Sequence, residues 1–204
     1  MYMYFMDDKT LRAMEKIMRG VPNFKPRGHG VVVIYGLDYE PVNEPLSKLL
    51  IRTFQTIENK IFLKRLKEYI AECEVCNMNF KSELHRAVFN DMIRKKDNKN
   101  NALMSALYLL SADVRLSRIT KSCCKGNRIS FSSMRLNECS EDGYTLYAAA
   151  KDLYLGTRYL SIYDLADKDV VSSETFRLIC NAMVIRRFGI KAIQQERNEN
   201  SDQT

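Results

Sequence analysis

Histidine is the first candidate for chemistry near neutral pH, because an unperturbed imidazole titrates there. The chain has only two histidines, His29 and His85. His29 lies between two glycines in the loop sequence Lys25-Pro-Arg-Gly-His-Gly30, where a phosphate could approach the backbone. Neither histidine has an evident partner, whereas a metal-independent ribonuclease requires both a general base and a general acid. The sequence therefore predicts no catalytic residue, and it leaves His29 and His85 as the candidates of an alternative in which the chain cleaves RNA.

One pair of cysteines has a spacing that suggests a metal. Cys73-Glu-Val-Cys76 has the two-residue spacing with which two thiolates converge on one zinc ion. A tetrahedral site needs a second pair, and the side chains of the adjacent Cys123 and Cys124 would diverge on a helix. We therefore predict free thiols, no metal site and no cofactor.

Basic residues form the clearest concentration of charge. Of a net charge of +7, the excess lies in residues 81–135, which carry 12 basic and 4 acidic side chains. On a helix, Arg118, Lys121 and Lys125 would fall within about 60° of one another at 100° per residue. The predicted nucleic-acid-binding set joins this stripe to its basic neighbours: Arg94, Lys95, Lys96, Lys99, Arg115, Arg118, Lys121, Lys125 and Arg128. Such a field attracts polyanions, and the alternative interpretation is a solvated helix face.

Tyrosines recur in the last third of the chain. The spacing of Tyr144, Tyr147 and Tyr154 places them on one side of a helix, and Tyr159 and Tyr163 follow. We expect these rings to pack against the protein, with stacking on nucleic-acid bases as the alternative.

The elements that must position these side chains are mostly helical. Hydrophobic spacing predicts helices over residues 7–20, 44–73 (one long helix), 82–93, 102–110, 144–155 and 173–188, and a further helix starting at Asp113. The β-branched run Val31–Tyr35 predicts a strand, and residues 125–142 predict a loop with a short extended or single-turn piece. The predicted fold class is mainly α, helical bundle-like, with a minor β element near residues 31–35.

The polar run at residues 95–101 is the predicted boundary within the chain. It divides an N-terminal portion, residues 1–97, from a C-terminal helical unit, residues 100–190, and a disordered tail is expected over residues 191–204. Whether the two halves share one core stays open. The apolar run at residues 1–6 lacks a basic n-region, and the longest other run, residues 31–37, is too short to span a membrane. We expect a cytoplasmic protein without a membrane partner.

Residues 102–190 carry four segments that together resemble a known family: Leu107–Asp113, Tyr144–Lys151, Leu153–Thr157 and Phe176–Met183. That family consists of small proteins of unassigned function on bacterial mobile elements, plasmids and phage-like islands. The resemblance implies a role in transfer, regulation or counter-defence, and counter-defence includes anti-CRISPR inhibitors of RNA-guided nucleases. Such nucleases hold their guide RNA through its backbone, so a basic inhibitor could contact that RNA.

The leading expectation is therefore a nonenzymatic mobile-element accessory protein. It would bind nucleic acid, with RNA favoured, or a nucleoprotein complex, and inhibition of an RNA-guided nuclease is the most specific version. The alternatives are a small RNA-cleaving enzyme that uses His29 or His85, and a protein–protein interaction module. The oligomeric state stays open.

Overall fold

The computed structural model describes residues 25–27, 31–33, 44–75, 79–137 and 139–194. The chain divides into two compact units, residues 1–40 and 41–204. In the first unit, strands β1 (Lys25–Arg27) and β2 (Val31–Val33) pair antiparallel, with Pro26 opposite Val32. This pairing confirms the minor β element. The helix predicted over residues 7–20 lies outside the described residues.

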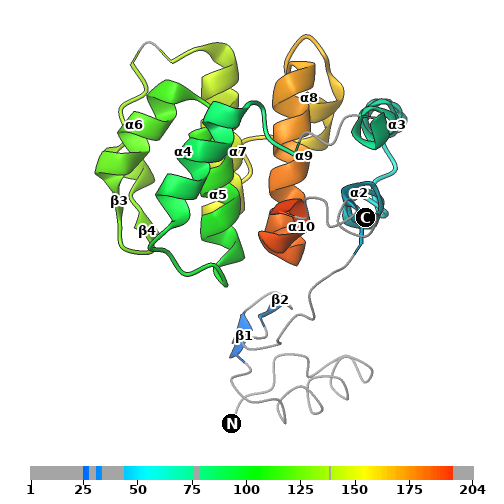
Figure 1. Cartoon of the computed structure of the whole chain (residues 1–204). Helices are drawn as coiled ribbons and strands as arrows, with labels where there is room; N and C mark the ends of the chain where they lie inside the picture. The colour runs from blue at the N-terminus through cyan, green and yellow to red at the C-terminus, as the bar shows by residue number, and fades with distance from the viewer. Residues whose placement is uncertain (1–24, 28–30, 34–43, 76–78, 138, 195–204) are drawn as a thin grey trace, which may run out of the picture. The chain divides into compact units, whose positions relative to one another are not determined.

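The second unit is helical, which confirms the mainly α fold class (Figure 1). Its helices are α2 (Leu46–Thr53), α3 (Lys60–Val75), α4 (Glu83–Ile93), α5 (Asn101–Ser111), α6 (Val114–Cys123), α7 (Glu141–Leu155), α8 (Ile162–Ala166), α9 (Ser173–Phe188) and α10 (Lys191–Gln194). A hairpin of β3 (Cys124–Lys125) and β4 (Arg128–Ile129) follows α6, and a 3-10 turn, η1 (Phe131–Ser133), follows the hairpin. None of the helices that the structure describes is long and apolar enough to cross a membrane.

Helix α5 forms the centre of this unit. Every residue from Leu103 to Ser111 is buried, because the helix is apolar on all sides and packs against α4, α6, α7 and α9. Helices α2 and α3 complete the core from the other side of α9, where the rings of Phe62 and Phe176 lie 5.5 Å apart. The polar run at residues 95–101, predicted as a boundary, forms the turn between α4 and α5 inside this unit, with Asn101 as the first residue of α5.

Residues 44–73 form two helices, so the prediction of one long helix is wrong. Helix α2 ends at Thr53, and the side chain of Asn59 starts α3 by accepting the backbone N–H groups of Ile61 and Phe62, each at 3.0 Å. The break lets the rings of Phe54 and Phe62 meet at 5.1 Å. Hydrophobic spacing missed it because both helices present apolar residues to the same core.

The first residues of the predicted tail form a helix. Residues 191–194 form α10, in which Ala192 and Ile193 are buried, so the prediction of disorder from residue 191 is wrong. The carbonyl of Ile193 also accepts a hydrogen bond of 2.8 Å from the Asn79 side chain. The two apolar residues explain the docking, since they supply a buried face to a single helical turn. Residues 195–204 lie outside the described residues.

Candidate nucleic-acid interface

Two basic segments, distant in sequence, lie side by side in the structure. Lys121 Nζ on α6 lies 2.8 Å from Asp91 Oδ2 on α4, and the backbone N–H of Asp97 donates to Asn127 Oδ1 at 3.2 Å. Lys96 donates to the backbone carbonyl of Gly126. We call the joined surface the basic ridge: Arg94, Lys95, Lys96, Lys99, Arg118, Lys121, Lys125 and Arg128.

The hairpin rather than a helix positions the end of this ridge. Helix α6 ends at Cys123, and Gly126, with a φ of 55°, turns the chain so that Lys125 pairs with Arg128 across the two strands. The buried side chain of Ile129 fixes the hairpin to the core. The prediction that Lys125 continues the helical stripe of Arg118 and Lys121 is therefore wrong. The dipeptide Gly126-Asn127 is the sequence signal of this turn, and the helical interpretation passed over it.

The ridge carries a strong positive excess. Residues 91–99 and 118–128 contain eight basic side chains and two carboxylates, Asp91 and Asp97. Asp91 lies within ion-pair distance of Lys121 and, at 3.8 Å, of Arg94. The hydrogen bond from Lys121 lowers the pKa of Asp91, so this carboxylate stays ionised. All ridge residues are exposed except the half-buried Lys96. The arrangement can therefore contact several phosphates along a polynucleotide backbone.

Arg115, a member of the predicted set, lies on α6 one helical turn before Arg118, at the margin of the ridge. It is in the first turn of α6, at the end of that helix away from the hairpin. Its charge acts on Cys139: burial and Asp113 raise the pKa of that thiol, and Arg115 acts in the opposite direction. The ridge thus contains eight of the nine predicted residues, and Arg115 lies next to it on α6.

Two tyrosines of α7 support the hairpin from behind. Tyr154 Oη accepts the backbone N–H of Ile129 at 3.3 Å and donates to the carbonyl of Asn127 at 3.4 Å. Tyr147 Oη donates to the carbonyl of Phe131 at 3.1 Å, and the Phe131 ring lies 5.5 Å from the ring of Tyr147. These contacts confirm the packing interpretation for Tyr147 and Tyr154. Sequence reasoning missed Asn127, which contacts both Asp97 and Tyr154.

His85 lies in the core with both ring nitrogens occupied. Nδ1 accepts the backbone N–H of Lys81 at 3.1 Å, so the proton is on Nε2, which donates to the carbonyl of Tyr108 at 2.9 Å. Burial of the imidazole lowers the pKa of His85 to about 4, and its side chain is only 2% exposed. This neutral, inaccessible ring serves the fold. The RNA-cleaving alternative then depends on His29, which lies outside the described residues.

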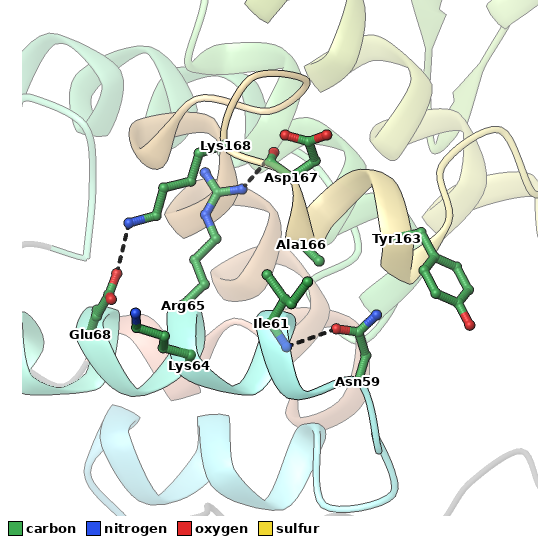
Figure 2. A pocket seen from close by; sticks show the side chains of 9 residues that line it. All are labelled: Asn59, Ile61, Lys64, Arg65, Glu68, Tyr163, Ala166, Asp167 and Lys168. Atoms are coloured by element: carbon green, nitrogen blue, oxygen red, sulfur yellow. Dashed lines mark hydrogen bonds and ion pairs between the residues drawn. The ribbon is translucent and has the colours of Figure 1, made fainter.

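A hollow of about 700 Å³ lies between α3 and α8 (Figure 2). It is lined by Asn59, Ile61, Lys64, Arg65, Glu68, Tyr163, Ala166, Asp167 and Lys168. Arg65, in its wall, donates to the backbone carbonyls of Leu165 at 2.8 Å, Asp167 at 3.0 Å and Val171, while Lys168 pairs with Glu68 at 2.9 Å. Burial lowers the pKa of Arg65. These charges hold α8 against α3, and no residue of the predicted nucleic-acid set lines the hollow.

Metal ligands do not gather in the part of the chain that the structure describes. There, no group of three or more His, Cys, Asp or Glu side chains is placed to hold an ion, and Cys76 of the Cys73–Cys76 motif lies outside it. No protein-family model matches the chain, and neither does any curated protein or solved structure. Residue geometry and charge therefore carry the functional argument.

Proposed function

We propose that this protein binds nucleic acid, with RNA favoured, through the basic ridge and without catalysing a reaction. The observation that supports the proposal most is the convergence of eight basic side chains from two segments around only two carboxylates. Phosphate groups are the counterions that such a surface selects, because each bound phosphate releases condensed cations from the polynucleotide.

Binding of this kind depends steeply on salt. If about six phosphates are contacted, the logarithm of the binding constant falls with the logarithm of salt concentration with a slope near −4 on a single strand. A protein whose charge serves only solubility shows weak binding with no preferred surface. Measuring the salt dependence of binding, together with neutralising chosen basic residues, therefore distinguishes a nucleic-acid interface on the ridge from a surface charge that serves only solubility.

The test neutralises three exposed ridge residues that the ridge's internal bonds do not use: Arg118→Gln, Lys125→Gln and Arg128→Gln together. A matched control neutralises three exposed lysines of α2 and α3: Lys48→Gln, Lys60→Gln and Lys67→Gln. Fluorescence anisotropy with a labelled single-stranded RNA should show the salt slope of the ridge variant reduced by about 2, because each lost phosphate contact removes about 0.7 from it. The control variant, with the same loss of net charge, should keep the slope of the unaltered protein. Equal effects of the two variants, or none from either, contradict the proposal.

The more specific version of this proposal is inhibition of an RNA-guided nuclease by contact with its guide RNA. Two observations support it: the family resemblance of residues 102–190 and the positive charge of the ridge. A positive surface is attracted to the guide RNA itself, and not to the basic protein surface with which the nuclease holds that RNA. The unaltered protein should then reduce target cleavage by a guide-loaded nuclease, and the ridge variant should not. If cleavage is unchanged with every such nuclease while RNA binding still depends on the ridge, the inhibitor proposal is contradicted and the general proposal of RNA binding stands.

A further inference from the structure

Beside the hairpin, three tyrosines surround one lysine at the protein surface. Lys151 Nζ donates to Tyr159 Oη at 2.8 Å and lies 4.4 Å from the centre of that ring. The rings of Tyr144 and Tyr147 lie 6.5 Å apart at 34° to one another, and both tyrosines are close enough to Lys151 to affect its pKa. We call Tyr144, Tyr147, Lys151 and Tyr159 the tyrosine cluster.

The fold holds this cluster in place. At 100° per residue, positions 144, 147, 151 and 154 of α7 fall within about 80° of one another. Tyr159 joins them through a loop that Asp152 orders: its carboxylate accepts the backbone N–H of Tyr159 at 2.9 Å and that of Leu160 at 3.0 Å. Gly156, with a φ of 74°, ends α7 and lets the loop turn back. The rings are therefore presented on a rigid helix and a braced loop.

Two of these rings are open to solvent although they are large. Tyr144 is 57% exposed and Tyr159 is 56% exposed, while Tyr147 is half-buried under the segment that follows the hairpin. The hydrogen bond with Tyr159 raises the pKa of Lys151, so a fixed positive charge lies among the rings. Exposed aromatic faces next to a cation are the elements with which proteins hold unpaired bases and their phosphates.

We infer that the two exposed rings of the tyrosine cluster, Tyr144 and Tyr159, form a base-stacking site for single-stranded nucleic acid whose phosphates lie on the basic ridge. The inference rests on the proposed function. The hairpin connects the two surfaces: it carries Lys125 and Arg128 of the ridge and leads directly into Phe131, which contacts Tyr147. A duplex keeps its bases stacked inside, so only a single strand can place bases on these rings.

The experiment compares unstructured single-stranded RNA, single-stranded DNA and an RNA duplex of equal length by fluorescence anisotropy. The double substitution Tyr144→Ala, Tyr159→Ala should weaken single-strand binding at least about tenfold. The reason is that the stacking of a base on an aromatic ring contributes a free energy of binding that corresponds to about this factor. Duplex binding should stay unchanged. The double substitution Tyr144→Phe, Tyr159→Phe keeps the rings and should keep single-strand affinity. Similar losses on RNA and DNA indicate stacking alone, and a loss on RNA only indicates further contacts to the 2′-hydroxyl.

Tyr163→Ala is the matched control, because Tyr163 is an even more exposed tyrosine, at 79%, and lines the hollow at α8 instead. It should leave all affinities unchanged. Equal losses on single strands and duplex, no loss from the alanine pair, or an equal loss from Tyr163→Ala would each overturn the inference. In these cases, ridge-dependent binding that persists shows that the proposed function stands. Failure of the unaltered protein to bind any of the three probes would overturn both.

Discussion

The buried polar network around Tyr108 and the basic ridge are both rich in side chains that could do chemistry, but they differ in whether these side chains have partners within the protein. Around Tyr108 the polar groups find their partners inside the chain: Tyr69 Oη donates to Asn181 Oδ1 at 2.6 Å, and Asn181 Nδ2 donates to Tyr108 Oη at 3.3 Å. On the basic ridge, eight cations share two carboxylates. The polar groups around Tyr108 are not available to a ligand, because they already hydrogen-bond to one another. The basic ridge has an excess of positive charge, which only solvent ions or a polyanion can balance.

The buried region also explains why the tyrosines and the histidine in it stay neutral. Burial raises the pKa values of Tyr69 and Tyr108 and lowers that of His85 to about 4. The network joins α3, α5 and α9 and reaches α10 through Asn79. Residue type alone therefore does not identify a functional site. The better indicator is whether the polar and charged groups already have partners within the protein.

The largest expected effect is on the buried network. Asn181→Ala removes the acceptor of the Tyr69 hydroxyl and two hydrogen bonds donated to Tyr108 Oη and the Asn79 carbonyl. The free energy of unfolding should fall by about 3 kcal/mol, because buried polar groups are left without partners. Urea denaturation measures this change. The RNA affinity of the folded variant should match that of the unaltered protein, and a fall below about 1 kcal/mol would contradict the structural role.

A second effect comes from the titration of His85. Its folded-state pKa of about 4 lies below the ordinary value of 6.5, so the unfolded chain binds a proton first as the pH falls. Stability from neutral His85 is complete above pH 6.5 and is lost progressively toward pH 4, by about 2 kcal/mol between pH 6.5 and 5. Lys81 and Glu174 are the charged groups that also act on this imidazole. Urea denaturation across this range should show the slope, His85→Ala should remove it, and His29→Ala should not. An identical slope in the His85 variant would show that another group titrates.

A smaller effect sharpens the account of the ridge. Asp91→Asn removes one of its two carboxylates and frees Lys121 from its ion pair. RNA affinity should increase a few-fold and the salt slope should steepen by about 1, while stability changes little because the pair is exposed. Anisotropy titrations at several salt concentrations measure both. Weaker RNA binding in this variant would mean that Asp91 positions Lys121 for contact rather than competing with the phosphate.

Local signals predicted the helices well. The helices predicted over residues 82–93 and 173–188 and from Asp113 all form, and at their starts the side chains of Ser82, Asp113 and Ser172 accept backbone N–H groups. Gly189 follows the last residue of α9, which is where the helix predicted over residues 173–188 was expected to end. These features depend on residues within one helical turn, so the sequence states them directly.

Features that depend on distant contacts escaped sequence reasoning. The break before Asn59 shows only when α2 and α3 pack on each other, and helix α8 was not predicted, although Ser161 and Asp164 form its capping box. For the candidate site, charge counting found the basic residues, but their convergence depends on Asp91 meeting Lys121 and on Asp97 meeting Asn127. The helical stripe predicted for Arg118, Lys121 and Lys125 ends at the hairpin. Gly126 is the residue that signals this turn, and the helical interpretation did not consider it.

Mapping where RNA contacts the folded protein tests directly whether the basic ridge is the nucleic-acid interface. In a backbone amide NMR titration with an unstructured RNA, we expect shift changes concentrated at residues 94–99 and 118–131, with further changes around Tyr144 and Tyr159. Residues 59–68 and 163–168, which line the hollow between α3 and α8, should stay unchanged. Changes confined to the hollow, or spread evenly over every exposed basic residue, would contradict a nucleic-acid interface on the basic ridge.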